Sequence, residues 1–332
     1  MRSILSRANA LRSMCWLPPP GFCIIGSPMK SLRHWLEYAA LWLALKFLGL
    51  LPRRTARALG AAAASALFAL RPPLGRTALF NLKLAFPEWT DERRREVVRG
   101  MVRQLGWMAG EFSQFPKYAR GRVEDVVKLD GLENFLAAER RGKGVLFLTG
   151  HLGAWELAPF AQARYGHPLH FLVRAMDNPH VDTLINGYRS LSGNAPIEKN
   201  QSARAILRIL QEGGTVGILA DQNTLPDEAV FVDFFGIPAS TTSGIARVGL
   251  HTGAAVVPGY IFWDEPARKY CLRLEPEIEL SRTGDLDRDI LDNTARFTRV
   301  IEDFIRRYPD QWVWVHKRWK IRPEGTPPIY PF

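Results

Sequence analysis

The pattern of apolar and polar positions changes near residue 127. Downstream of that residue, short apolar runs alternate with segments in which apolar residues recur about every three to four positions, as expected of strands alternating with helices. This alternation predicts an α/β fold with a mostly parallel central sheet and helices on both of its faces. Strands are predicted at 145–149, 170–173, 215–220, 230–233, 255–262 and 270–275, and helices at 132–141, 154–165, 180–192, 202–212, 242–252 and 288–307.

Upstream of residue 127 the pattern is helical, and residues 35–51 form its most apolar stretch. That stretch approaches the roughly 20 residues that span a bilayer, but it contains Glu37 and Lys46. We interpret it as a membrane anchor that either spans the bilayer or lies in the interface, with Trp35 and Trp42 at the depth of the headgroups. A cleaved signal peptide is not predicted, because no convincing small-residue cleavage site precedes a mature domain.

Four parts of the chain are distinguished on this basis. Residues 1–30 are predicted to be a disordered tail or, alternatively, residues upstream of a true start at Met29. Residues 31–54 are predicted to be the membrane-anchor helix and residues 55–126 a helical segment that packs on the core. Residues 127–332 are then the α/β core.

The composition narrows the range of partners. The 332 residues carry a formal net charge of +11, which favours anionic partners such as a phospholipid surface, a phosphorylated substrate, an acidic carrier protein or nucleic acid. Nucleic acid is the least supported of these, because the sequence has no zinc-finger spacing, no basic region followed by heptads and no aromatic RNA-binding signature. The three cysteines are too few and too scattered for a disulfide framework or a Cys-x2-Cys metal site.

The candidate chemistry lies where the apolar run 145–149 ends in a Gly-His pair and an amphipathic segment follows. This arrangement predicts a buried strand, a tight turn and the start of a helix. His151 is expected in the turn and Glu156 in the first turns of the helix, from where its carboxylate can reach back to the imidazole. An imidazole held by a carboxylate is a common general base. Gly150 and Gly153 are predicted to leave backbone N–H groups open for an oxyanion or a phosphate.

Two further groups of polar residues follow predicted strands. Arg174 comes directly after one strand and Arg189 lies in the next helix, and the planar guanidinium group suits phosphate and carboxylate, although a helix cap or a surface salt bridge would also account for them. Asp221 and Gln222 follow another strand, where they would orient a hydroxyl, extend a hydrogen-bond network to the histidine, or only cap a turn. Ligands of open α/β sheets bind beyond the carboxyl ends of the strands, so these four are candidate substrate-binding residues.

The C-terminal segment 308–323 is rich in tryptophan and basic residues. These side chains would either meet lipid headgroups and phosphates, or close the core while the charges remain solvated. The sequence leaves both interpretations open.

The string Thr149-Gly-His-Leu-Gly-Ala-Trp-Glu156 resembles the His-x4-acid motif of membrane-associated acyltransferases, with Glu in place of Asp. That variant is similar to the lipid A biosynthesis acyltransferase family, whose lauroyl and myristoyl transferases add secondary chains to lipopolysaccharide. Arg174 and Arg189 match arginines of the family pattern. The Asp-Gln, Phe-Phe-Gly and Pro-Ala-Ser-Thr elements occur in the family's order within residues 221–241, and the resemblance extends over about residues 36–323.

The resemblance implies a fold like that of glycerolipid acyltransferases and a direct transfer reaction. His151 would deprotonate an acceptor hydroxyl and Glu156 would hold the imidazole. The acyl donor would be acyl carrier protein, and the acceptor a 3-hydroxyacyl chain of a phosphorylated lipid A precursor at the cytoplasmic face of the inner membrane. No cofactor other than the acylated carrier protein and no metal would be needed. A covalent acyl-enzyme has no obvious nucleophile, because there is no Gly-x-Ser-x-Gly elbow.

Three alternatives remain at the level of the sequence. The same superfamily includes enzymes that acylate other acceptors, such as a phosphatidylinositol mannoside or a lysophospholipid. A metallohydrolase would use His151 and Glu156 as metal ligands, although no second histidine falls at helical metal spacing near them. A protein that binds membranes without catalysis would keep the basic charge and lack turnover.

Overall fold

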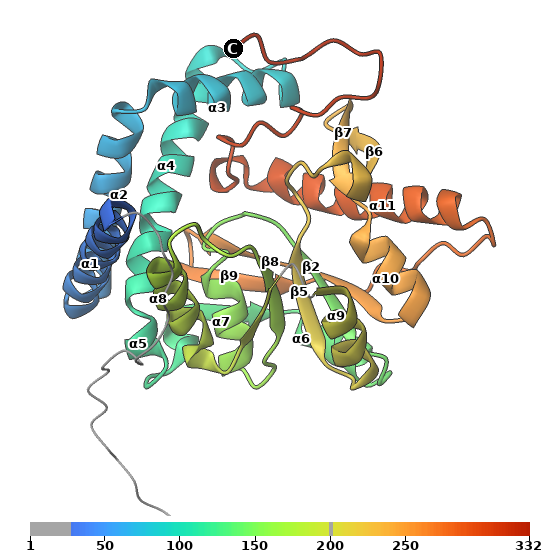
Figure 1. Ribbon diagram of the computed structural model, residues 1–332, viewed down its shortest axis with the longest axis horizontal. Coiled ribbons are helices and arrows are strands. Elements are labelled where there is room, and N and C mark those ends of the chain that lie inside the picture. The colour runs from blue at the N-terminus through green and yellow to red at the C-terminus, as the bar shows by residue number, and fades with distance from the viewer. Residues whose placement is uncertain (1–27, 199–201) are drawn as a thin grey trace, which may run out of the picture.

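The computed structural model describes residues 28–198 and 202–332, and Figure 1 shows how their elements are arranged. The tail predicted for residues 1–30 lies outside the described residues except at its end, where residues 28–30 belong to the first helix, α1 (Pro28–Leu50). A central sheet is flanked by helices, and the N-terminal helices stand together at one side of it (Figure 1).

Within the described residues, the central sheet has seven strands in the order β1-β9-β8-β2-β5-β3-β4. Neighbouring strands are parallel except β8 and β9, which form an antiparallel hairpin. The predicted α/β class with a mostly parallel sheet is therefore confirmed. The strands are Val127–Asp130 (β1), Val145–Thr149 (β2), His170–Val173 (β3), Ala195–Glu198 (β4), Thr215–Leu219 (β5), Ala255–Asp264 (β8) and Lys269–Leu274 (β9).

Both faces of the sheet are buried, and strand β2 shows how. Val145 and Phe147 point into one hydrophobic core, and Leu146 and Leu148 point into a second core on the opposite face. This explains the continuous apolar run of β2, because a strand buried on both faces has no polar alternation. The first core is closed by α6 (Leu132–Glu139), α7 (Leu157–Arg164) and α8 (Pro179–Arg189), and the second by α9 (Ser202–Gln211), α10 (Gly244–Thr252) and α11 (Leu286–Arg307).

The sequence-based assignment of strands was wrong in two respects. Strands β1 and β4 were not predicted, because each is a four-residue strand at an edge of the sheet and gives only a short apolar signal. The strand predicted at 230–233 exists as β6 (Ala229–Phe234). Within the described residues it pairs only with β7 (Ile237–Thr242), a strand that was also not predicted, in a separate hairpin. The pattern of side chains shows that a segment is extended and does not identify its partner strand.

The N-terminal helices pack closely on one another and on the sheet. They are α2 (Arg53–Ala69), α3 (Pro72–Ala85), α4 (Asp91–Ser113) and the single turn α5 (Phe115–Tyr118), and further single turns of 3₁₀ helix lie at Val123–Asp125, Ser190–Ser192, Pro226–Glu228 and Pro309–Gln311. Helices α2 and α4 approach so closely that a Cβ on Gly60 would lie 2.2 Å from the carbonyl oxygen of Gly106. The guanidinium of Arg57 in α2 lies between the rings of Trp107 and Trp263, 3.6 and 4.0 Å from their centroids. These contacts fix α2 against the core.

Helix α1 covers residues 28–50 and lies against α8 and α4. No helix within residues 28–198 and 202–332 is both long enough and apolar enough to cross a membrane. Several apolar side chains of α1 nevertheless face outwards. They are Leu32, Trp35, Leu36, Trp42, Leu43, Phe47 and Leu50.

Candidate active site

The order of the strands brings His151 and Asp221 together. His151 lies in the turn after β2 and Asp221 follows β5, and these two strands are parallel neighbours whose last residues, Thr149 and Leu219, are paired. The Nδ1 atom of His151 lies 2.8 Å from Oδ1 of Asp221, and the backbone N–H of His151 donates to Oδ2 over 2.7 Å. The ends of adjacent parallel strands thus form a histidine–aspartate pair.

Asp221 is buried and is held from two sides. Its side chain is almost fully removed from solvent, and the indole N–H of Trp312 donates to Oδ2 over 2.7 Å. Gly150 makes room for the carboxylate, because a Cβ at that position would lie 3.1 Å from the carboxyl carbon and from Oδ2 of Asp221. The carboxylate is therefore fixed in position before any substrate binds.

The electrostatics of the pair follow from this geometry. Burial alone would raise the pKa of Asp221, but the charge of His151 and the hydrogen bonds from His151 and Trp312 outweigh it and lower the pKa to about 2. Burial alone would lower the pKa of His151, but the charge and hydrogen bond of Asp221, with a further contribution from the charge of Glu156, raise it. An ionised carboxylate only accepts hydrogen bonds, so Nδ1 of the imidazole carries the proton and Nε2 is the basic nitrogen.

The predicted contact between Glu156 and the imidazole is wrong. Glu156 sits at the N-cap of α7, one residue before the helix begins, and its carboxylate bonds to Arg189, with distances of 2.8 Å from Nε to Oε2 and 2.5 Å from Nη2 to Oε1. Residues 151–156 form an irregular turn where a helix from residue 154 was predicted. The carboxylate of Glu156 consequently turns towards the C-terminal end of α8 and away from Nδ1 of His151.

The two glycines have different roles in the turn. The N–H of Gly153 donates to the carbonyl oxygen of Gln311 over 2.7 Å, next to an antiparallel bridge between Leu152 and Trp312. This amide is occupied, so the predicted oxyanion role of Gly153 is wrong for this structure. Gly153 is needed for another reason: its φ is +58°, and a Cβ would lie 2.1 Å from the carbonyl oxygen of Ile261. The N–H of Gly150 forms no hydrogen bond with another described residue, and its oxyanion role stays a prediction.

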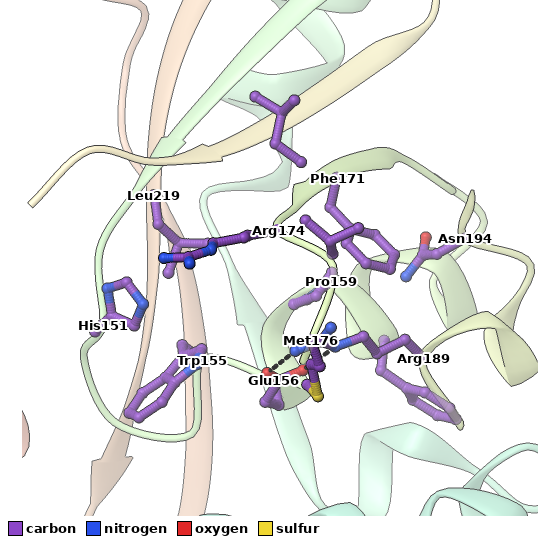
Figure 2. Close-up of a pocket in the computed structure, with 13 residues that line it drawn as sticks. His151, Trp155, Glu156, Pro159, Phe171, Arg174, Met176, Arg189, Asn194 and Leu219 are labelled. Atoms are coloured by element: carbon purple, nitrogen blue, oxygen red, sulfur yellow. Dashed lines mark hydrogen bonds and ion pairs between the residues drawn. The ribbon is translucent and has the colours of Figure 1, made fainter. Parts of the chain in front are cut away.

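A pocket opens beside His151, and Figure 2 shows the residues around it. Four predicted site residues line it together: His151, Glu156, Arg174 and Arg189. Arg174 is exposed and forms no hydrogen bond or ion pair with the described residues, whereas Arg189 is bonded to Glu156. Apolar side chains supply much of the remaining wall, among them Pro159, Phe160, Phe171, Leu172 and Leu219. Cations and an apolar wall therefore face one cavity.

The pKa of Arg189 is raised. Burial alone would lower it, but the hydrogen bonds and the charge of Glu156 outweigh the effect of burial. Gln222 is half-buried and, like its neighbour Asp221, does not line the pocket. Within residues 28–198 and 202–332, no group of three or more His, Cys, Asp or Glu side chains is arranged to hold a metal ion.

The C-terminal segment closes the core behind the site. Trp312, Trp314 and Trp319 are fully buried, and so is Arg318, which donates to the carbonyl oxygen of Ser240 and to Oγ1 of Thr241, both over 2.6 Å. The interpretation in which these tryptophans meet lipid headgroups is therefore wrong, because the rings pack inside the protein. Burial lowers the pKa of Arg318 to about 10.

Sequence reasoning missed two residues next to the pair. Trp312 binds Asp221 directly, and Nε2 of His316 accepts a hydrogen bond from the backbone N–H of Asn223 over 3.2 Å. In the sequence, both stand out only as members of the aromatic and basic segment 308–323. The only signal that could have singled them out is the Trp-x-Trp-x-His spacing, which does not reveal that the segment lies against the residues that follow β5.

Comparisons with known proteins agree with this architecture. Residues 27–321 match the family described as bacterial lipid A biosynthesis acyltransferase. The chain is 28% identical to the lipid A biosynthesis lauroyltransferase of Escherichia coli, over 89% of this chain and 94% of that protein. It is 26% identical to a lipid A biosynthesis acyltransferase of Haemophilus influenzae, over 74% of this chain and 75% of the relative, and 25% identical to the E. coli lipid A biosynthesis myristoyltransferase, over 75% and 76%. The chain belongs to the bacterial lipid A biosynthesis acyltransferase family and is an acyltransferase.

Proposed function

We propose that this enzyme moves a fatty acyl chain from acyl carrier protein to the hydroxyl of a 3-hydroxyacyl chain on a phosphorylated lipid A precursor. The observation that carries the proposal is the position of His151: its imidazole is held from behind by Asp221 and faces a pocket with apolar walls and two arginines. An apolar wall suits an acyl chain, and a guanidinium suits an anionic group of the acceptor or the donor.

His151 acts as the general base in the proposed reaction. Its Nε2 atom removes the proton from the acceptor hydroxyl while the oxygen attacks the carbonyl carbon of the thioester. The tetrahedral intermediate then collapses, the carbon–sulfur bond breaks, and the departing thiolate takes the proton from the imidazolium. Asp221 stabilises the imidazolium between these steps, in line with the raised pKa of His151, which burial opposes and the charge and hydrogen bond of Asp221 produce. No cofactor takes part in this sequence.

Glu156 does not contact the reacting atoms in this scheme and acts through His151 and Arg189. Its charge adds to the raised pKa of His151, after the larger effects of burial and Asp221, and its carboxylate holds the side chain of Arg189 at the pocket. The N–H of Gly150 is the proposed donor to the tetrahedral oxyanion. Removal of one such donor costs enzymes of acyl transfer about 3 kcal/mol of transition-state stabilisation.

We place the enzyme at the cytoplasmic face of the inner membrane, with α1 in the lipid interface. Support comes from the outward apolar side chains of α1, including Trp35 and Trp42, and from basic residues near both of its ends. Aromatic rings at headgroup depth and basic residues near anionic lipids are typical of helices that lie in an interface.

The test of the proposed function is transfer from lauroyl-, myristoyl- and palmitoyl-carrier protein to a tetra-acylated lipid A precursor that carries Kdo. Turnover is expected for the wild type and for His251→Ala, which changes an exposed histidine outside the pocket. Loss of about 10²-fold or more is expected for His151→Ala, the scale of general-base catalysis.

Two outcomes would contradict the proposal. Equal turnover by His151→Ala and wild type would remove His151 from the reaction. Absence of turnover by folded wild type with all three donors would reject this acceptor, and the same donors would then be offered to a lysophospholipid and to a phosphatidylinositol mannoside. Metal analysis of the active protein tests the metallohydrolase alternative, which requires a bound metal ion.

A further inference from the structure

The side chain of Asn178 binds the loop at the pocket entrance to the N-terminal helix. Residues 174–178 connect β3 to α8, and two of them, Arg174 and Met176, line the pocket. Asn178 is 6% exposed and is the N-cap of α8, where its Oδ1 accepts hydrogen bonds from the N–H groups of His180 and Val181 at 3.0 and 3.4 Å. The Oδ1 atom therefore caps the N-terminus of α8.

The other half of the same amide bonds to α1. The Nδ2 atom of Asn178 donates to the carbonyl oxygen of His34 over 2.8 Å and to Oε2 of Glu37 over 2.9 Å. A helix cap needs only an acceptor, so the two donated bonds are not required for α8 to begin. Next to them the ring of Trp35 stacks on that of His180, with centroids 4.3 Å apart. The first half of α1 therefore rests on the beginning of α8.

Helix α8 is connected to the pocket at both of its ends. At its start the N–H of Met176 donates to Oδ1 of Asp182 over 3.0 Å, which ties the loop to the first turn. Arg189 is its last residue and bonds to Glu156. A displacement of the start of α8 thus moves the loop that carries Arg174, while the pair of His151 and Asp221 stays on the sheet.

We propose that Asn178 and Glu37 are positioning residues for substrate binding: together they hold the pocket entrance in place through α1. This rests on the proposed function, because the pocket they position is the one assigned to acyl transfer. The outward side of the same helix carries Leu36 and Leu43, which are 62% and 60% exposed. The helix assigned to the lipid surface and the loop assigned to substrate binding are then one connected unit.

The experiment separates the cap from the link. Asn178→Ser keeps an acceptor for the cap of α8 and removes both donors to α1, and Glu37→Ala removes one acceptor from the other side. Glu37→Ala is expected to raise KM about fivefold, the effect of one ordinary hydrogen bond, and Asn178→Ser is expected to raise it more because it removes two. The kcat of both variants is expected to stay within about twofold of the wild type. The double variant is expected to equal Asn178→Ser, because that variant already removes the hydrogen bond to Glu37 together with the one to His34. Glu37→Gln, which keeps an acceptor oxygen for Asn178, is expected to restore KM.

Thr183→Ala is the matched control, since Thr183 is exposed on α8 and bonds only to Pro179 within that helix. Hydrogen exchange of the Met176 amide is the second measurement and does not depend on turnover. Faster exchange in Asn178→Ser and Glu37→Ala, with wild-type exchange in Thr183→Ala, is expected. Unchanged exchange and unchanged KM would overturn the inference even in an active enzyme, and so would a loss of kcat at constant KM. If the two variants exchange faster but the wild type acylates no acceptor, the proposed function is rejected and the link between α1 and the loop is kept.

Discussion

The turn that carries His151 and the loop that carries Arg174 face the same pocket and are built in opposite ways. Behind His151, the carboxylate of Asp221 is buried and accepts hydrogen bonds from the imidazole, from a backbone amide and from Trp312. On the other side, Arg174 is exposed and bonds to no described residue. A reacting base has to be positioned before the substrate arrives, whereas a binding cation is most useful when its hydrogen-bond donors are still free.

The largest expected effect is that of Asp221→Asn. The amide keeps the shape of the side chain but cannot stabilise an imidazolium, and it favours the wrong tautomer of His151. We expect kcat to fall about 10³- to 10⁴-fold, as in other enzymes whose general base loses its carboxylate. Steady-state kinetics with the preferred acyl donor measures this loss. Asp227→Asn changes an exposed aspartate outside the pocket and serves as the control. A fall of less than tenfold would show that Asp221 is a structural residue.

The second prediction compares the two carboxylates directly. Glu156→Gln should lower kcat/KM by about tenfold to hundredfold, which corresponds to one or two units of 1.4 kcal/mol and to the usual value of a hydrogen bond to a charged group. The loss should be smaller than that of Asp221→Asn, because Glu156 bonds to Arg189 and not to the imidazole. Glu133→Gln, on the exposed face of α6, is the control. If Glu156→Gln were the more damaging variant, Glu156 would contact the imidazole during the reaction, as the sequence alone predicts.

These two carboxylates also show how far the sequence can lead. The apolar run of β2 and the Gly-His pair place the candidate base correctly, because a buried strand and a tight turn are local features. The partner of His151 is 70 residues away, and it becomes a neighbour only because β5 lies next to β2 in the sheet, ahead of β3 and β4. A single sequence does not contain the strand order, so it points to the nearer carboxylate, that of Glu156.

The same limit explains the errors at the turn and at the C-terminus. The amide of Gly153 is occupied by Gln311, and Asp221 is bonded by Trp312, so both depend on a segment about 90 to 160 residues further along the chain. Arg174 and Arg189 were placed correctly at the pocket because they follow β3 and end α8, and ligands of such sheets bind at that edge. Positions that depend on one strand end were predictable, and positions that depend on distant segments meeting were not.

The third prediction concerns the open side of the pocket. Arg174→Ala should raise KM about tenfold and leave kcat within about twofold, because the variant removes a charged contact to the substrate that is made equally in the ground and transition states. Arg99→Ala, an exposed arginine on α4 away from the pocket, tests whether lost positive charge alone has this effect. A fall in kcat at constant KM would assign Arg174 to the transition state, and would make the two sides of the pocket more alike than the structure indicates.

The smallest expected effect is a shift of the pH profile. Burial lowers the pKa of His151, but the charge and hydrogen bond of Asp221 raise it by more and Glu156 adds to the rise, so that the pKa lies above its ordinary value of 6.5. A general base works only when neutral, so kcat/KM should fall as the pH decreases through this raised pKa.

Glu156→Gln removes one negative charge near the imidazole and leaves Asp221 in place. The variant's pKa of His151 should therefore be lower, and its acidic limb should move to lower pH relative to wild type and to Glu133→Gln. Because Asp221, which is bonded to the imidazole, raises the pKa of His151 more than the more distant Glu156 does, this shift is expected to be modest. A shift to higher pH would contradict the prediction, because the loss of the negative charge of Glu156 and the unpaired positive charge of Arg189 both lower the pKa of His151. An unmoved limb would mean that the charge of Glu156 does not reach the imidazole.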